Sequence, residues 1–222
     1  DMPDINLNAE RRHMVLNEMT ATVGSVFLGL SIGCAQCHDH KADPISQADF
    51  YRLRAFFEGG LTFSEQDLGK GRGKGRVMAE TAKPVSTRFA VRGDFRRAGP
   101  VVQPAVPRIA RENQTPARAT NRAQLARWMG ATGNPLFRRT IANRLWQFHF
   151  SQPLAATPSD LGRTGERPTH PALLDWLAAE LPRRNWSLKS MHRLLLSSAT
   201  YRQASRSEED TWEKRLDADP EN

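Results

Sequence analysis

The sequence predicts a mainly α-helical protein, with two helical segments joined by an extended, Pro/Gly-rich linker that holds at most a short β element. Apolar residues recur at helical spacing before residue 58 and again after residue 120. Between these blocks the composition shifts to glycine, lysine, arginine and proline, which favour turns and extended chain. We therefore expect a helical segment over residues 1–60, a flexible loop, short strand and Pro-rich linker over 61–116, and a small helical bundle over 117–222.

Two helices are expected in the first segment. Asn8 is the predicted N-cap of the first helix, whose apolar face continues to Leu30. Gly29 and Gly33 near its end let a flat group approach the backbone closely. Ser46 and Asp49 have the spacing of a capping box, so they predict the start of a second, aromatic-rich helix.

The middle segment is predicted to have little regular structure. Residues 69–76 alternate glycine with lysine or arginine and hold no apolar side chain, so we expect a flexible, solvated loop. Residues 85–91 alternate apolar and polar side chains, which predicts one short strand with little pairing. The prolines between residues 100 and 116 then indicate an extended linker.

Helical periodicity returns in the last segment. A short helix is expected from Asn121, and a longer one from Asn134, which is followed by proline at the first helical position. Further helices are expected after His170 and from the N-cap Ser187. Short connections between amphipathic helices favour a small bundle.

Composition restricts the possible partners but does not select one. The chain has 222 residues, 39% of them hydrophobic, and a net charge of +8 with pI near 10.2. This balance is compatible with a solvated basic surface, nucleic acid, an anionic polysaccharide or an acidic redox partner. We do not expect nucleic acid, because no aromatic residues are interleaved with the basic run. No window reaches the roughly 18 apolar residues of a membrane helix.

Both cysteines lie in one motif, Cys34-Ala35-Gln36-Cys37-His38. This C-x-x-C-H pattern is typical of covalent attachment of a c-type haem. Two thiols one helical turn apart can each form a thioether to a vinyl group of the haem. The next residue, His38, would then be the proximal axial ligand of the iron, and hence also a metal ligand.

Other interpretations of the motif remain open. A C-x-x-C pair can be a redox dithiol or disulfide, half of a zinc site, or two core thiols. The sequence has no third cysteine for a common zinc site, and a cage that adds His38 and His40 would place four donors within seven residues. A thioredoxin-like motif begins a helix after a strand, whereas here a helical stretch precedes the motif.

Longer motifs extend around the cysteines and through the last segment. Residues 34–45 read C-A-Q-C-H-D-H-K-A-D-P-I, and the C-terminal motifs include N-R-L-W at 143–146, P-T-H-P at 168–171 and S-A-T-Y-R-Q at 198–203. In these motifs the chain resembles planctomycete-type cytochrome-c-like proteins. These are large exported proteins with two adjoining domains of unknown function, often fused to a cytochrome c domain. One departure is Ser151-Gln152-Pro153, where the family usually has glycine, a basic residue and glycine.

The resemblance implies an exported, cytochrome-c-like protein in periplasmic electron transfer or redox chemistry, with haem c as the cofactor. The chain begins at Asp1 without a methionine, so we interpret it as a fragment whose missing N-terminal part carries a signal peptide. The expected partners are a redox protein or a cytochrome domain of the same full-length chain, with polysaccharide as a further candidate. The alternative function is a haem-free helical interaction module of a polysaccharide-processing system, with a local Cys34–Cys37 disulfide.

The remaining site residues are predicted around this motif. Asp39, His40 and Asp43 are expected to orient His38 from the second shell, to bind a hard cation or to cap the next helix. His149 is the first candidate for a sixth iron ligand, because its predicted helix is rich in aromatic residues. The other candidates are His13, His170, His192, Met14 and Met19. No hydrolase signature is present, so the sequence leaves open whether the protein is an enzyme.

Overall fold

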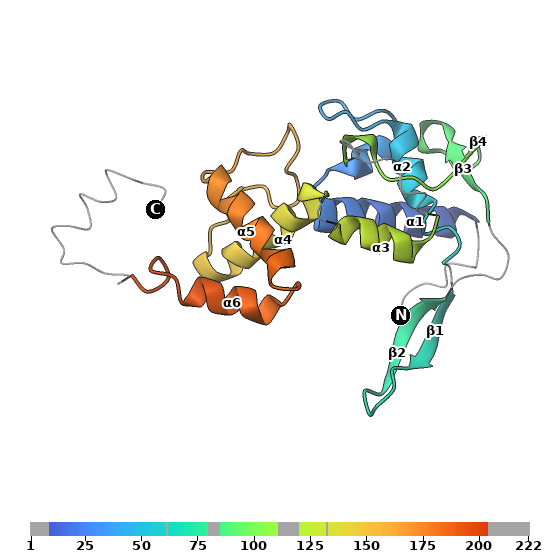
Figure 1. The fold of residues 1–222 in the computed structure, drawn as a ribbon. Coiled ribbons are helices and arrows are strands. Elements are labelled where there is room, and N and C mark those ends of the chain that lie inside the picture. The colour runs from blue at the N-terminus through green and yellow to red at the C-terminus, as the bar shows by residue number, and fades with distance from the viewer. Residues whose placement is uncertain (1–8, 61, 80–84, 111–119, 132, 204–222) are drawn as a thin grey trace.

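The computed structural model describes residues 9–60, 62–79, 85–110, 120–131 and 133–203. The described part contains six α-helices and four β-strands (Figure 1). The helices are α1 Ala9–Val23, α2 Gln47–Arg54, α3 Arg122–Gly130, α4 Pro135–Phe150, α5 Pro171–Arg183 and α6 Leu188–Leu196. The strands are β1 Thr62–Asp67, β2 Lys74–Ala79, β3 Thr87–Ala90 and β4 Ala98–Val102.

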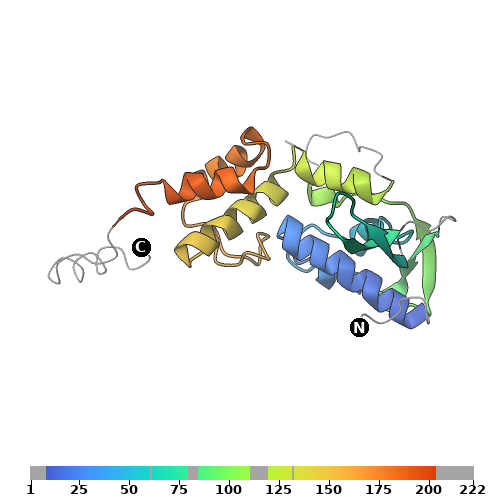
Figure 2. The ribbon, with the colours of Figure 1, turned by 90° about the horizontal axis from the view of Figure 1, so that it is seen from below.

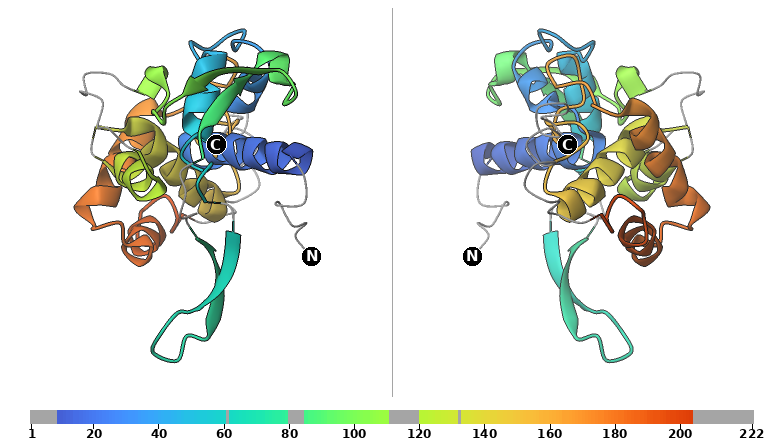
Figure 3. Two further views of the ribbon diagram at one scale, coloured as in Figure 1. Left: turned by 90° about the vertical axis from the view of Figure 1, so that its right-hand side faces the viewer. Right: turned by 90° about the vertical axis from the view of Figure 1, so that its left-hand side faces the viewer.

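The predicted fold class is wrong in its β content. The described residues form two antiparallel two-stranded sheets, β1–β2 and β3–β4, where at most one short β element was expected. The β1–β2 hairpin projects from the body as an arm (Figures 1 and 3) and pairs Thr62 with Ala79 and Asp67 with Lys74. Its turn explains the error, because Gly69, Gly71 and Gly73 all have positive φ angles. The glycines let the chain reverse over residues 68–73, so the first part of the run forms the hairpin turn and residues 74–76 lie in β2.

The predicted short strand is confirmed as β3, but it does not stand alone. It pairs with β4, with a register shift between Arg88 and Ala90. The β4 strand occupies residues that were expected to be extended linker. Of the linker prolines, Pro116 lies outside the described residues.

The predicted helix starts after residue 40 are confirmed. Ser46 and Asp49 form a capping box at α2. The side chains of Asn121, Asn134 and Ser187 each accept a backbone hydrogen bond at the start of α3, α4 and α6. Asn8, the N-cap predicted for the first helix, lies outside the described residues.

The first helix ends earlier than the apolar periodicity suggested. It stops at Val23, and a π-helical turn, Gly24–Leu28, follows. Gly29 then has a left-handed backbone with φ of 59°, which ends the helical path. Met14, expected on the buried face, is 63% exposed, whereas Leu16 and Thr20 are buried. Val15, Met19 and Val23 do pack against the first core, so on α1 the expected apolar face is confirmed apart from Met14.

Two hydrophobic cores divide the described chain. The first gathers α1, α2, β3 and α3 around buried residues that include Phe50, Tyr51, Leu125 and Trp128. The second joins α4, α5 and α6 through residues that include Leu145, Leu177 and Leu195. Figure 2 shows the two groups side by side, with α4 reaching toward α1. Although the sequence assigned α3 to the C-terminal bundle, its buried side chains belong to the first core.

Hydrogen bonds to backbone carbonyls join the two groups. The amide of Leu161 donates to the carbonyl of Gly29 at 2.7 Å. The guanidinium of Arg144 on α4 donates to the carbonyls of Val26 at 2.6 Å and Ser25 at 3.3 Å. The turn that follows α1 is thus held by the C-terminal helices. Among the described helices, none has the length and apolar character needed to cross a membrane.

Candidate functional site

The motif cysteines lie on one face of a short 3₁₀ helix, Ile32–Gln36, with Cys37 as its C-cap. This helix has about three residues per turn, so residues three apart share a face. Ile32 and Ala35 are fully buried on one face, while Cys34 and Cys37 are exposed on another as free thiols. The two sulfurs are therefore presented together to solvent, as attachment of a flat group requires.

The carbonyl of Gln36, between the two cysteines, is held by two donors. It accepts a hydrogen bond from the Tyr51 hydroxyl at 3.1 Å and from the Gln47 side-chain amide at 2.9 Å. Gln47 also donates to the carbonyl of Ala90 at 3.2 Å. Burial raises the pKa of Tyr51 to about 12, so its hydroxyl keeps the donated proton at physiological pH. The motif turn is thereby fixed to α2 and β3.

His38 follows directly and is exposed. Its Nδ1 lies 2.7 Å from the carbonyl oxygen of Asp39. Because a carbonyl can only accept, Nδ1 must carry the hydrogen, and in the neutral ring Nε2 then keeps its lone pair. This tautomer is the one in which imidazole can bind a metal ion through Nε2.

The predicted second-shell side chains have other partners. The carboxylate of Asp39 accepts the amide of Gln47 at 2.7 Å at the start of α2. The Nδ1 of His40 accepts the amides of Asp43 at 2.9 Å and Ala42 at 3.3 Å, and its Nε2 lies 3.1 Å from the Ser31 hydroxyl. Both ring nitrogens of His40 are therefore occupied. It is the backbone carbonyl of Asp39, not a carboxylate, that orients His38.

Asp43 connects the motif segment to the C-terminal helices. Its carboxylate is 1% exposed, and Oδ1 accepts the amide of Arg163 at 2.8 Å. Gly162 lies so close that a Cβ there would collide with Oδ2. Oδ2 is buried without a hydrogen-bond partner and lies 3.8 Å from Nδ1 of His40. The role of Asp43 in this fold is to join the two groups of helices.

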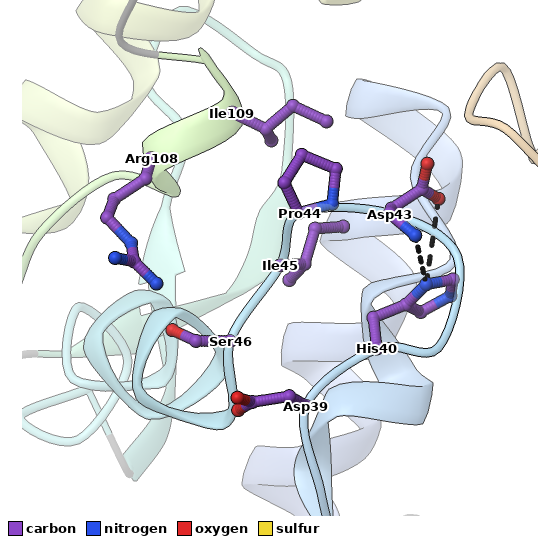
Figure 4. A pocket seen from close by; sticks show the side chains of 8 residues that line it. All are labelled: Asp39, His40, Asp43, Pro44, Ile45, Ser46, Arg108 and Ile109. Carbon is purple, nitrogen blue, oxygen red and sulfur yellow. Dashed lines mark hydrogen bonds and ion pairs between the residues drawn. The ribbon is translucent and has the colours of Figure 1, made fainter.

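A hollow of about 560 Å³ lies beside the motif (Figure 4). Its lining comes from the loop after His38 and from a turn after β4; the residues are Asp39, His40, Asp43, Pro44, Ile45, Ser46, Arg108 and Ile109. Arg108 contacts the buried carboxylate of Asp49 at 3.2 Å. Hydrogen bonds from Ser46, then Arg108, hold the pKa of Asp49 below its usual value despite burial. The hollow thus combines fixed charges with an apolar wall.

The loop between β3 and β4 covers one side of Cys37, a contact that the sequence did not reveal. A Cβ on Gly93 would lie 2.6 Å from the sulfur of Cys37, and the φ angle of Gly93 is 77°. Glycine is required there both for space and for backbone conformation. The sequence Arg92-Gly93-Asp94 follows the strand predicted over residues 85–91, and nothing in it indicates that Cys37 is a neighbour.

His13 braces this loop from α1. Its ring lies 3.2 Å from the carbonyl of Gly93 through Nε2 and 3.0 Å from Arg54 through Nδ1. Nδ1 accepts from the guanidinium, and Nε2 also lies 2.9 Å from the side-chain amide nitrogen of Asn17. Burial, and then the charge of Arg54, lower the pKa of His13. His13 is therefore a packing residue, not a free ligand.

His149, the predicted sixth ligand, lies in another environment. Its Nε2 is 2.8 Å from Nδ1 of His192 on α6, and its ring contacts that of Tyr201. Partial burial, and then His192, lower the pKa of His149. The hydrogen bond joins α4 to α6 within the second group of helices, so the structure does not bring His149 together with His38.

The other predicted ligands are also dispersed. His170 is exposed beside the Thr169 hydroxyl, and Met14 is exposed on α1. Met19 packs against the first core. Among the described residues, no group of three or more His, Cys, Asp or Glu is placed to hold a metal ion.

The departure at Ser151 has a clear structural effect. Ser151 follows α4 with φ of 66°, a left-handed conformation that glycine adopts more easily. The turn after α4 therefore keeps the glycine-type backbone with a serine, at the position where the resembling proteins usually have glycine.

Comparison with known proteins gives two matches. Residues 3–60 match a family model described as PSCyt2, a protein of unknown function (DUF1549). Residues 121–222 match a family model described as PSD1, a protein of unknown function (DUF1553). Each match covers less than half of the chain, and residues 61–120 separate the two matched segments. No curated protein and no solved structure matches the chain.

The two matches follow the structure closely but not completely. The PSCyt2 segment contains the motif turn, α1 and α2, and the PSD1 segment contains α3 to α6. Because α3 packs into the first core, the PSD1 segment contributes to the fold around the motif. The β strands lie between the two matched segments.

Proposed function

We propose that this chain is the haem-attachment part of an exported c-type haem protein that transfers electrons in the periplasm. The observation that carries the proposal is that two thiols and an imidazole nitrogen are exposed together at the motif turn. Cys34 and Cys37 present free thiols on one exposed face, and His38 presents Nε2 with its lone pair. Covalent haem attachment needs these donors in this order.

The residues present fit the donor requirements of haem c. Each exposed thiol can form one thioether, and the buried face of the same turn, Ile32 and Ala35, anchors it to the first core. The carbonyl of Asp39 fixes the tautomer and orientation of the imidazole, as outer-shell acceptors of metal-bound histidines do. When bound, haem supplies reversible one-electron chemistry at its iron.

The protein's own contribution is to hold the motif turn and to orient the two cysteine sulfurs. Tyr51 and Gln47 fix the carbonyl between the cysteines, which restricts the direction in which both sulfurs point. Gly93 lies against Cys37 and closes one side of the turn. We leave His149 out of the proposed ligand set, because its Nε2 is bonded to His192 on a different pair of helices.

Localisation and partners belong to the same proposal. Haem is attached to c-type cytochromes outside the cytoplasm, and this supports export of the protein. A redox protein, or a cytochrome domain of the same full-length chain, is the proposed partner. The match to PSCyt2, whose name refers to cytochromes, also supports the proposal.

The alternative function is a haem-free helical interaction module in a polysaccharide-processing system. The observation in its favour is that two free thiols share one face of a single turn, so they are placed to form a local disulfide as well. In that case the motif would stabilise the turn after α1 and would carry no electrons.

The deciding experiment is periplasmic expression in a host that attaches haem c, followed by denaturing mass spectrometry and an absorption spectrum. The proposal expects a mass increase of one haem and a Soret band. Replacement Cys37→Ala should lose both, whereas the control His170→Ala should keep both. A colourless protein whose mass is lower than that of the reduced chain by two hydrogen atoms would support the disulfide alternative.

A further inference from the structure

The loop between β3 and β4 contacts Cys37 through Gly93 and carries three arginines, Arg92, Arg96 and Arg97. Its ends are closed by a hydrogen bond of 3.0 Å from the amide of Val91 to the carbonyl of Arg97. The amide of Arg97 donates in turn to the carbonyl of Asp94 at 3.0 Å. Since Gly93 lies against the sulfur of Cys37, this closed loop has a fixed position beside the exposed thiols.

The loop carries an excess of positive charge. Arg92, Arg96 and Arg97 are all exposed. Arg96 is paired with the carboxylate of Asp94 at 2.9 Å, and Glu10 on α1 also acts on it. Arg92 and Arg97 form no ion pair among the described residues. Arg97 also acts electrostatically on the carboxylate of Asp94.

We propose that Arg92 and Arg97 form a docking surface for a redox protein whose contact face carries clustered carboxylates. The inference rests on the proposed function, because such a partner would exchange electrons with the group held by Cys34 and Cys37. Arginine forms two parallel hydrogen bonds with a carboxylate and remains charged at every physiological pH. Charges at the rim of a contact surface mainly raise the rate of encounter and set its salt dependence.

The first test measures the charge effect at Cys37 and needs no haem. It uses a Cys34→Ser protein, so that one motif thiol reacts with either dianionic dithiobis(nitrobenzoate) or neutral dithiodipyridine. Adding Arg92→Gln and Arg97→Gln should slow the dianionic reagent about two- to fivefold at low salt and leave the neutral reagent unchanged. The control pair Lys189→Gln and Arg193→Gln removes the same charge from exposed positions of α6.

The control decides between a local and a global effect. If both pairs of substitutions slow the dianionic reagent equally, only the net charge of the chain matters and the docking surface is refuted. A change with the neutral reagent would show that the loop has moved, and a near-ultraviolet circular dichroism spectrum of each variant checks for this.

The second test uses the haem-loaded chain and reduced flavodoxin, a small acidic one-electron carrier, as the probe. The Arg92→Gln/Arg97→Gln variant should lower the second-order rate of electron transfer about two- to tenfold at low ionic strength and flatten its salt dependence. The Lys189→Gln/Arg193→Gln variant should not.

Two further outcomes have distinct meanings. Unchanged rates with flavodoxin, together with lost retention on immobilised heparin, would identify a surface for polyanions and overturn the redox proposal. A protein without haem would overturn the proposed function, and the redox partner with it. The thiol rates would still show whether the arginines act on Cys37.

Discussion

The carboxylate of Asp43 accepts a hydrogen bond of 2.8 Å from the backbone amide of Arg163, and this bond joins the segment that follows the C-x-x-C-H motif to the C-terminal helices. The sequence positions are 120 residues apart. Asp43 is only six residues after Cys37. The geometry of the motif loop therefore depends on both matched segments of the chain.

Removal of this carboxylate should destabilise the protein. Replacement Asp43→Ala leaves the Arg163 amide without its acceptor in a partly buried position, at an expected cost of about 1–3 kcal/mol in the free energy of unfolding. This loss is measured by urea denaturation, with circular dichroism as the signal. The control Asp175→Ala breaks an exposed pair with Arg139 and should cost less than about 1 kcal/mol. Equal losses would mean that Asp43 has no special part in joining the helices.

The close approach of Gly162 gives a second prediction. Replacement Gly162→Ala puts a methyl group against the Asp43 carboxylate, so the loop must shift, and we expect a loss of about 1–3 kcal/mol in unfolding free energy. Gly130→Ala is the matched control, because its nearest neighbouring atom would be 3.9 Å away. Thermal denaturation of both variants provides the comparison. An unchanged stability of Gly162→Ala would contradict the close contact of Gly162 with the Asp43 carboxylate.

Tyr51 should stabilise the motif turn through its hydroxyl. Replacement Tyr51→Phe removes the hydrogen bond to the Gln36 carbonyl, with an expected cost of about 0.5–1.5 kcal/mol. The thiols of Cys34 and Cys37 should also react faster with a neutral alkylating reagent, because the turn is less restrained. Tyr201→Phe, in a 44% exposed side chain, is the control and should change neither quantity. If thiol reactivity stays constant in Tyr51→Phe, the hydroxyl does not restrain the turn.

His13 should make stability depend on pH. Its folded-state pKa is lowered by burial and by Arg54, so below pH 6.5, the ordinary pKa of histidine, the unfolded chain binds a proton more readily than the folded one. The stabilising contribution is therefore complete above pH 6.5, and it is lost as the pH falls from there through the lowered folded pKa.

The check is the difference in unfolding free energy between the unmodified chain and His13→Gln, measured by urea denaturation from neutral to mildly acidic pH. As the pH falls, the unmodified chain should lose more unfolding free energy than His13→Gln does. His149, whose pKa is also lowered, is present in both proteins and cancels. A difference that does not vary with pH would show that His13 has its ordinary pKa in the folded protein.

Local signals in the sequence predicted the helices well. Ser46, Asn121, Asn134 and Ser187 cap the helices that their positions indicated, because a side-chain oxygen satisfies a backbone amide within three residues. The strand at Thr87–Ala90 was found from its alternation. These features depend on neighbours in sequence, so they can be read without the fold.

The features that the sequence did not predict depend on distant contacts or on turn geometry. The β1–β2 hairpin was missed because its glycine and cation run resembles a flexible loop, and only the paired backbone shows otherwise. The contact of Gly93 with Cys37 and the bond between His149 and His192 join residues far apart in the chain. Apolar periodicity predicts that a histidine lies on a helix, but it does not predict which side chain forms a hydrogen bond with the imidazole. The motif cysteines could be identified from spacing, and the supports around them could not.

The position of α3 has a practical consequence for anyone who divides this chain. Leu125 and Trp128 lie in the segment matched to PSD1, yet they pack in the first core, which also buries Ile32 and Ala35 of the motif turn. A cut before residue 121 would remove both side chains from the core of the N-terminal piece. On the C-terminal piece they would form an exposed apolar surface. A break between α3 and α4 would keep Leu125 and Trp128 in their core but would still cut the hydrogen bonds that Gly29 and Asp43 accept from Leu161 and Arg163, so neither piece would be whole.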